Sequence, residues 1–333
     1  MKKIKIAYTD CWKKLNPDTF IITQILRKRY DVELVSSPEE NPDFVFCFFF
    51  GSDYLKYSCP RILFTGEAIC PDFNVYDYGI GFERMSYSDR YLRYPLYLLD
   101  KEGLNSVLNK HTQPDEYFLS RKEFCCMVVS NDNSPIRNKY FDKISEYKKI
   151  ASGGRYRNNL PDGKPVEDKD AFQRGYRFCL CFENSSMPGY ATEKIIDAYK
   201  SGCIPIYYGD KDIEKEFNPR SFIHVKGKVD FEETISRIKE IENDREKYLE
   251  MCHAPAVPDD SPLLNMMKDD YLEEFLYNII DQNPSDAIRR HSALTMWGKA
   301  YEQKLKKLKS IEENTIVKGV TNIKRKLIGR KKL

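Results

Sequence analysis

Two cations stand where proteins commonly bind phosphate groups. Arg137 follows Pro135 at the predicted start of a helix, and Lys194 lies in the first turn of another, each helix coming after a strand. Helix N-termini at the ends of parallel strands direct N–H groups and a positive dipole toward anions. A lysine there is disfavoured unless an anion lies beside it. Each cation alone is more commonly a solvated surface charge, but together they indicate a diphosphate site.

A glutamate stands at the end of a strand in the first half of the chain. The apolar run RILFT is followed by Gly66 and then Glu67, so the predicted strand presents this carboxylate at its carboxyl end. A glutamate in a turn is usually structural. Opposite a diphosphate leaving group, however, it would be placed to deprotonate a nucleophile. Tyrosines between 76 and 97 offer flat faces that suit sugar rings, although core packing explains most of them equally well.

Other nucleotide and metal motifs are missing from the sequence. Neither GxGxxG nor GxxxxGK[ST] occurs, which argues against dinucleotide and P-loop chemistry. The 4 histidines and 10 cysteines show no paired CxxC spacing, so we predict no metal site. Asp210 and Asp212 could resemble a metal-binding D-x-D, but we interpret one of them as the cap of a helix from Asp212 to Phe217.

The elements that would position these side chains alternate between strands and helices. In the first half we predict strands at 5–8, 32–35, 43–50 and 61–65, with a helix near 18–29. In the second half we predict strands at 124–130, 178–182 and 203–209, with helices through Phe141 and Tyr147 and from Thr192 onward. This alternation predicts two α/β domains facing across a cleft. We place them at 1–122 and 123–285, followed by C-terminal helices and a basic tail at 286–333.

Composition fits a globular protein. Of the 333 residues, 41% are hydrophobic and 32% charged, and no window approaches the roughly 20 apolar residues that span a bilayer. The opening MKKIKIAYTD meets Asp10 before any apolar run of signal-peptide length, so it is predicted to be the first strand. Most cysteines lie in apolar runs, which suits a reducing compartment. We therefore expect a cytoplasmic protein.

The last 33 residues differ in charge from the rest. Residues 301–333 hold 11 Lys and Arg against 3 Glu, whereas the preceding 300 residues hold 43 basic against 48 acidic groups. Apolar residues recur at roughly helical spacing among these cations, namely Leu305, Leu308, Val320, Ile323 and Leu327. This pattern predicts an amphipathic helix on the anionic inner face of the cytoplasmic membrane, with a solvated terminal helix as the alternative. The acidic body argues against nucleic acid as a partner.

Several ordered motifs resemble those of the α-1,3/4-fucosyltransferase family, and the bacterial members are most similar. The segment 176–208 resembles the family's donor-site motif, and the resemblance continues in FNPRSFI at 217–223, NSPIRN at 133–138, RILFTGEA at 61–68 and DYGIGFERMSYSDRYLRYPLY at 77–97. It implies an inverting glycosyltransferase of GT-B type with two Rossmann-like domains and GDP-fucose as the donor.

The resemblance also implies roles for individual residues. Glu67 matches the family's catalytic base, and Arg137 matches the arginine on the donor pyrophosphate. Asn184, Tyr190, Glu193 and Lys194 match the donor-binding loop and helix, with Glu193 near ribose or fucose hydroxyls and Lys194 on phosphate. No tightly bound cofactor and no protein metal site is implied, although a divalent cation could stimulate the reaction.

We therefore expect transfer of L-fucose from GDP-β-L-fucose to an oligosaccharide of a cell-surface glycan. The acceptor would be an N-acetylglucosamine or glucose residue, as in N-acetyllactosamine, and the product an α-1,3 or α-1,4 linkage. Ala68 stands where the family often has Asn, and heptad repeats before the tail are missing, so acceptor contacts can differ. Two alternatives stay open: a transferase using another GDP-sugar, and a catalytically silent sugar-nucleotide-binding protein.

Overall fold

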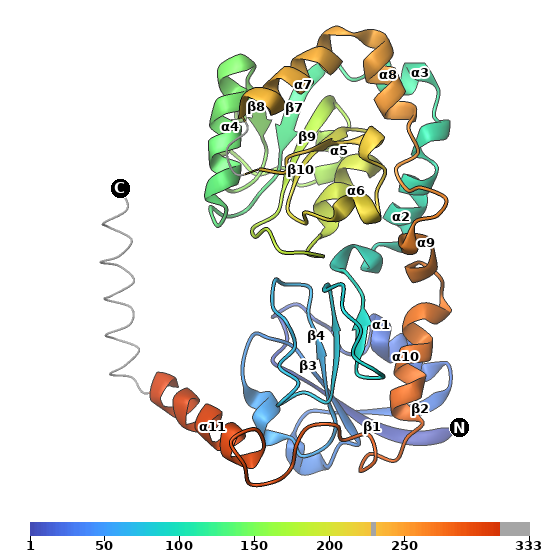
Figure 1. Cartoon of the computed structure of the whole chain (residues 1–333), viewed down its shortest axis with the longest axis vertical. Helices are drawn as coiled ribbons and strands as arrows, with labels where there is room; N and C mark the ends of the chain where they lie inside the picture. Colours follow the sequence, from blue (N-terminus) through green and yellow to red (C-terminus); the bar gives the residue numbers. More distant parts are fainter. Residues whose placement is uncertain (228–230, 314–333) are drawn as a thin grey trace.

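The computed structural model describes residues 1–227 and 231–313 and contains two parallel sheets (Figure 1). In spatial order, the first sheet consists of β2 (Tyr30–Val35), β1 (Lys2–Thr9), β3 (Phe44–Cys47), β4 (Arg61–Phe64), β5 (Tyr78–Gly81) and β6 (Tyr91–Arg93). The second consists of β11 (Ile223–His224), β10 (Ile204–Tyr208), β9 (Tyr176–Phe182), β7 (Glu123–Met127) and β8 (Ile150–Ser152). The predicted α/β fold with two parallel sheets is confirmed.

The two sheets share one topology. In each, the first strand along the chain, β1 or β7, has the second strand on one side and all later strands on the other. The strand order therefore reverses between β1 and β3 and between β7 and β9. Ligands of such sheets bind outside the carboxyl ends of the strands at this reversal.

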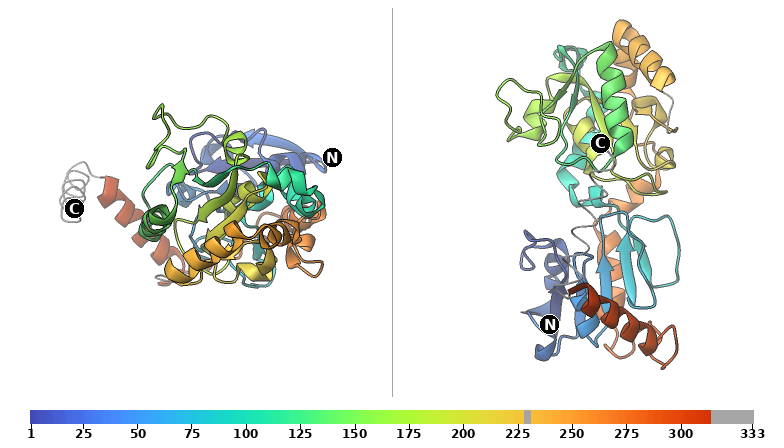
Figure 2. Two further views of the ribbon diagram at one scale, coloured as in Figure 1. Left: turned by 90° about the horizontal axis from the view of Figure 1, so that it is seen from above. Right: turned by 90° about the vertical axis from the view of Figure 1, so that its left-hand side faces the viewer.

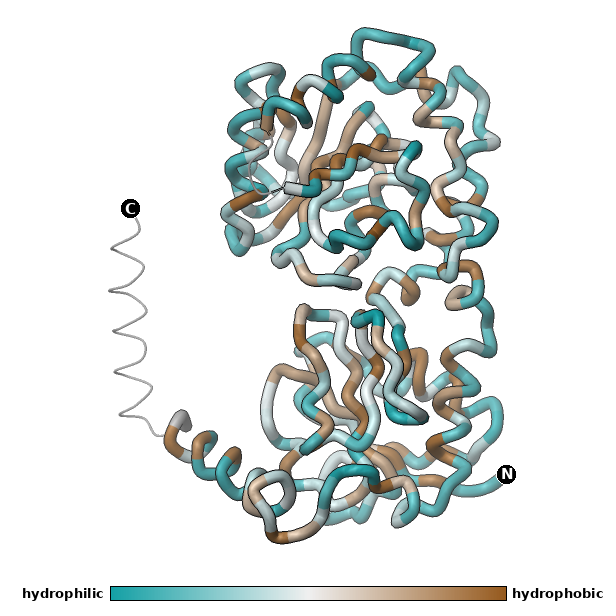
Figure 3. Tube along the Cα trace, viewed as in Figure 1, coloured by the Kyte–Doolittle hydropathy of each residue, from teal (hydrophilic) through white to brown (hydrophobic). Residues whose placement is uncertain are grey.

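Helices pack around both sheets. Within the described residues they are α1 (Ile21–Arg27), α2 (Lys101–Leu108), α3 (Asp115–Leu119), α4 (Pro135–Tyr147), α5 (Lys169–Gln173), α6 (Glu193–Lys200), α7 (Phe231–Asn243), α8 (Arg245–His253), α9 (Pro262–Met266), α10 (Asp270–Ile280) and α11 (Lys299–Glu313). Hydrophobic residues concentrate along the strands between these layers (Figure 3). Every residue of β3, β4 and β10 is buried, as expected of strands covered on both faces.

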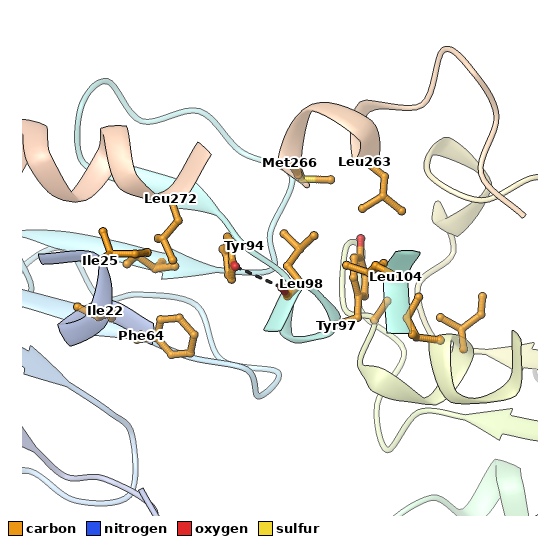
Figure 4. Packing of buried hydrophobic residues seen from close by; sticks show 14 of the residues in the cluster. Ile22, Ile25, Phe64, Tyr94, Tyr97, Leu98, Leu104, Leu263, Met266 and Leu272 are labelled. Atoms are coloured by element: carbon orange, nitrogen blue, oxygen red, sulfur yellow. Dashed lines mark hydrogen bonds between the residues drawn. The ribbon is translucent and has the colours of Figure 1, made fainter. Parts of the chain in front are cut away.

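One hydrophobic core runs through both units, which lie one above the other (Figure 2). Figure 4 shows its middle portion, where Tyr94 and Leu98 lie between Phe64 of the first sheet and Leu263 of α9. The same cluster continues into the second unit through Ile195 of α6. Burial of apolar area contributes about 25 cal/mol per Å². This shared core therefore gives the two units a stable mutual arrangement.

The chain returns to the first unit after completing the second. α10 packs against α1, and Lys2 Nζ donates to the carbonyl oxygen of Ile280 at 3.0 Å. Tyr30 donates its hydroxyl to Asp281 at 2.7 Å. The division into domains at 1–122, 123–285 and 286–333 stays a prediction, and α10 lies in its second range while packing on the first unit.

The basic tail begins as a helix docked on the first unit. In α11, Tyr301 donates to Asp72 at 2.7 Å, and Glu302 accepts from the buried Arg61 at 2.8 Å. Leu305 packs against a buried cluster of the first sheet, whereas Leu308 is exposed. Of the five residues of the predicted apolar stripe, one therefore packs on the protein itself and one is exposed to solvent. Its remaining members, Val320, Ile323 and Leu327, lie outside the described residues.

Candidate active site

Arg137 spans the strand-order reversal of the second sheet. Pro135 is the first residue of α4, a position where proline's fixed φ is favourable and its missing N–H is not needed. Arg137, two residues later, donates from Nη1 to Asn184 Oδ1 at 3.0 Å and from Nη2 to the carbonyl oxygen of Asn131 at 2.6 Å. Asn131 follows β7 and Asn184 follows β9. The guanidinium therefore sits where the topology favours a ligand.

The charge of Arg137 has no carboxylate partner in the described part of the chain. The residue is only 1% exposed, and among residues 1–227 and 231–313 its Nε has no hydrogen-bond partner and its guanidinium forms no ion pair. Burial lowers the pKa of its guanidinium. A buried, unpaired cation is costly. An anionic ligand would supply the missing charge.

The cation at the start of α6 does have an anion beside it, namely Glu183. Lys194 Nζ donates to Glu183 Oε2 and to Thr192 Oγ1, both at 2.7 Å. Glu183 Oε1 also accepts the Thr192 N–H at 2.7 Å. Burial alone would lower the pKa of Lys194, but Glu183 and Glu193 outweigh it and raise that pKa. Sequence reasoning missed Glu183, although its place directly after a buried strand was a signal.

Contact of Lys194 with a diphosphate stays a prediction. The ammonium is not fully enclosed, since 18% of the Lys194 side chain is exposed. Glu193 lies 3.6 Å from it and is 45% exposed. The pair therefore retains an open side toward solvent, from which a ligand can approach α6.

Glu67 lies across from the loop before α6. It follows β4, and its Oε2 accepts a long hydrogen bond of 3.5 Å from the hydroxyl of Tyr190. Although the Glu67 side chain is exposed, surrounding atoms of both units desolvate the carboxyl group and raise its pKa. Lys194 partly opposes this shift. A carboxylate with a raised pKa at an accessible position suits a general base.

The structure thus brings the predicted residues together in three pairs. Arg137 contacts Asn184, Lys194 lies beside Glu193, and Glu67 meets Tyr190. Each stands either in the loop after a strand or in the first turn of the helix that follows that loop. The arrangement can bind an anion on the second unit and accept a proton on the first.

The predicted helix from Asp212 to Phe217 is wrong in type, because only a 3₁₀ turn at Ile213–Lys215 forms there. Of the two predicted cap residues, the Asp212 side chain makes no capping bond, whereas Asp210 Oδ1 accepts the N–H of Asp212 at 2.9 Å. Asp210 also accepts the N–H of Gly189 at 2.7 Å and contacts Arg84 at 2.5 Å. No group of three or more metal-ligating side chains gathers in residues 1–227 and 231–313.

Comparison with known sequence families gives two adjacent matches. Residues 6–100 match "Alpha-(1,3)-fucosyltransferase FucT N-terminal domain", and residues 118–253 match "Glycosyltransferase family 10 (fucosyltransferase) C-term". The α-(1,3)-fucosyltransferase FucT of Helicobacter pylori is 35% identical over 286 residues, which are 75% of this chain and 59% of that protein. The human 4-galactosyl-N-acetylglucosaminide 3-α-L-fucosyltransferase 9 is 31% identical over 135 residues, 39% of this chain and 36% of its own. The chain thus spans about three fifths of the bacterial relative.

Solved structures show the same likeness over more of the molecule. An α1,3-fucosyltransferase crystal structure superposes with a TM-score of 0.76 at 32% identity, covering 88% of this chain and 93% of that one. A second, of an α1,3-fucosyltransferase with GDP-fucose, has a TM-score of 0.67 at 30% identity and covers 83% and 91%. The two-unit architecture described above is therefore shared with these enzymes.

Proposed function

The chain belongs to glycosyltransferase family 10, the fucosyltransferases, and on that basis we propose that it is an inverting α-1,3-fucosyltransferase. It transfers L-fucose from GDP-β-L-fucose to a hydroxyl of an N-acetylglucosamine or glucose residue, as in N-acetyllactosamine, giving an α-1,3 or α-1,4 linkage. A structural neighbour solved with GDP-fucose supports the identity of the donor.

The reaction is a single displacement at the anomeric carbon of fucose. Glu67 takes the proton of the acceptor hydroxyl, whose oxygen forms the new bond to C1. The bond from C1 to the phosphate oxygen breaks, GDP leaves with its electron pair, and the β configuration becomes α. Negative charge therefore grows on GDP in the transition state, where Arg137 and Lys194 stabilise it. Asn184, Tyr190 and Glu193 hold the nucleotide sugar.

The observation that carries this proposal is that a candidate base lies on the first unit and a candidate anion site on the second. Arg137 is a buried cation without a carboxylate, at the reversal of the second sheet. Glu67 is a carboxylate with a raised pKa, 3.5 Å from Tyr190 on the loop that leads into α6. A base on one unit and an anion site on the other are what a displacement with a diphosphate leaving group requires. A stimulatory divalent cation stays a prediction.

Product analysis tests the activity directly. Purified protein is incubated with GDP-fucose and N-acetyllactosamine, lactose or lacto-N-biose, and the products are examined by NMR. A new α-fucoside on N-acetylglucosamine or glucose is expected, with GDP released in equal amount. Transfer from GDP-mannose but not from GDP-fucose would contradict the donor assignment. GDP binding without transfer to any acceptor would contradict the proposed reaction.

The tail supports a proposal about location. None of the helices in the described residues is long and apolar enough to cross a bilayer. Exposed Trp297, Leu308 and Ile311 lie in or just before α11, among several lysines. Such a combination favours the surface of an anionic membrane. Residues 301–333 accordingly hold the enzyme at the inner face of the cytoplasmic membrane.

Vesicle sedimentation tests this location. The full chain is expected to sediment with phosphatidylglycerol vesicles and not with phosphatidylcholine vesicles. A chain ending at residue 313 keeps the docked part of α11 but loses 7 of the 11 tail cations, so its binding should fall sharply. Unchanged sedimentation of that shortened chain would contradict the proposal.

A further inference from the structure

A buried ionic network joins the two units beside the loop at 183–192, which connects β9 to α6 and which we call the donor loop. Arg84 Nη2, after β5, lies 2.5 Å from Asp210 Oδ2 and 3.1 Å from Glu216 Oε1. Arg93, the last residue of β6, donates from Nη2 to Glu216 Oε1 at 2.6 Å. Asp210 and Glu216 belong to the second unit and are fully buried. We call these four residues the interdomain network.

The network holds the backbone of Gly189 from both sides. Asp210 Oδ1 accepts the N–H of Gly189 at 2.7 Å, and Arg93 Nη1 donates to its carbonyl oxygen at 3.3 Å. Gly189 has a φ of +87°, and a Cβ there would lie 2.4 Å from the carbonyl oxygen of Phe82. The backbone of the second unit thus touches that of the first at this glycine, which no other residue type can replace without displacement.

Tyr190, the next residue, is fixed by the same contacts. The hydroxyl of Tyr207 donates to the carbonyl oxygen of Tyr190 at 3.4 Å and accepts the N–H of Asp210 at 3.1 Å. Tyr190 in turn reaches Glu67. A continuous set of contacts therefore leads from the arginines of the first unit to the loop at the proposed base.

We propose that Arg84 and Arg93 are positioning residues for the transfer step. Arg84 acts on Gly189 through Asp210, whereas Arg93, held by Glu216, bonds the carbonyl oxygen of Gly189 directly. Fixing Gly189 in this way also fixes Tyr190, the next residue. The kinetic part of this inference rests on the proposed function.

The charges of the interdomain network indicate that it fixes the geometry of the donor loop and does not simply hold the two units together. Two guanidinium groups face two carboxylates, so the charges balance, and Tyr97 donates to the remaining oxygen of Glu216 at 2.6 Å. Buried ion pairs add little net stability over apolar packing, because desolvation offsets their attraction. The apolar core beside Tyr97 already joins the units. What the ions add is a defined geometry.

Variants of Arg93 separate positioning from adhesion. Arg93→Met removes the charge at similar length, and Arg93→Lys keeps the charge but loses the planar fork. Arg220→Met is the control, since Arg220 forms an exposed ion pair with Glu250 at 3.0 Å. The readouts are kcat with GDP-fucose, the Kd of GDP and the hydrogen exchange of residues 185–192.

For Arg93→Met we expect kcat to fall about 10-fold to 100-fold, as misplacement of a positioning loop commonly does. The Kd of GDP should change by less than about threefold, because Arg137 and Lys194 stand on other elements. Exchange of residues 185–192 should become faster, with Arg93→Lys intermediate and Arg220→Met unchanged. If Arg93→Met does not fold, the intermediate kcat and exchange of Arg93→Lys carry the test.

The inference is overturned if folded Arg93→Met, or Arg93→Lys in its place, keeps wild-type kcat and wild-type exchange of residues 185–192. It is equally overturned if the Kd of GDP rises as much as kcat falls, since the arginine would then serve donor binding as a whole. A wild-type enzyme that transfers no fucose would refute the proposed function instead. The exchange experiment would still decide whether the network holds the loop.

Discussion

Two buried arginines allow a controlled test of the anion site. Arg137 is 1% exposed and Arg61 is 2% exposed, so their desolvation is similar. Arg61 is paired with Glu302 at 2.8 Å, whereas Arg137 bonds the amide oxygens of Asn184 and Asn131 and the backbone of Asn131, but no carboxylate of the described residues. Replacing each with methionine keeps most of the apolar stem and removes the charge. Arg61→Met should lower the unfolding free energy and leave the affinity for GDP unchanged. Arg137→Met should lower the affinity for GDP and leave the unfolding free energy nearly unchanged.

The expected magnitudes follow from these contacts. Arg61→Met leaves Glu302 only the more distant Arg290 Nε at 3.6 Å, and it also removes the donors to the carbonyl oxygens of Tyr57 and Val75. Breaking a buried ion pair in this way costs about 3 kcal/mol or more. In Arg137→Met, two charge-assisted hydrogen bonds of about 1.5–3 kcal/mol each are lost. Relief of a desolvation penalty of several kcal/mol offsets them. The unfolding free energy of the unliganded Arg137→Met protein should therefore change by less than about 2 kcal/mol.

The assay is thermal denaturation with and without GDP. With the usual unfolding entropy per residue, a change of 1 kcal/mol shifts the midpoint of a 333-residue protein by roughly 1–2 °C, so Arg61→Met should melt roughly 4 °C lower. GDP at about 100 times its Kd stabilises the folded wild type by about 2.7 kcal/mol. Arg61→Met should retain that increment and Arg137→Met should lose most of it. If Arg137→Met is as unstable as Arg61→Met and still stabilised by GDP, Arg137 is structural and our reasoning fails.

Three further predictions concern the carboxylates. Glu67→Gln should lower kcat about 10²- to 10⁴-fold, as loss of a general base does, with the Kd of GDP unchanged in titration calorimetry. In the wild type, kcat/KM should fall as pH falls through the raised pKa of Glu67, because the protonated carboxyl group cannot act as a base. The acidic limb of the pH profile should therefore lie above 4.5, the ordinary pKa of a glutamate. A limb below that value would contradict the assignment. Glu183→Gln should lower the unfolding free energy, measured by urea titration, by about 1–3 kcal/mol, because an amide cannot neutralise Lys194. Equal stability of variant and wild type would show that this ion pair contributes nothing.

The sequence was most informative where local pattern decides structure. The buried strand at 178–182, the polar loop and the helix after Thr192 correspond to β9, its loop and α6, because apolar runs and loop residues such as Pro188 and Gly189 act within a few residues. Arg137 and Glu67 could be predicted for a similar reason: Glu67 comes shortly after β4, and Arg137 lies in the first turn of the helix that follows β7. The positions were predictable although their partners were not.

Partners across the fold depend on tertiary structure and gave no local signal. Asp210 looked like a helix cap, yet it meets Arg84, which is 126 residues away. Lys194 looked as if only a ligand could balance it, yet Glu183 does so from the end of the neighbouring strand. In both cases a charge of the right sign was expected, and long-range packing decided which group supplies it.

The return of α10 to the first unit has a consequence for synthesis of the protein. Strands β1 to β6 are complete at Arg93, but α1 stays uncovered on one side until Asp270–Ile280 has been made. At a usual elongation rate, the intervening stretch takes roughly 10 to 40 s to translate. During that interval the apolar residues of α1 that α10 later covers are exposed to solvent, and a chaperone has time to bind them. A nascent chain that terminates before α10 should therefore be a target for degradation even though its first sheet is entire.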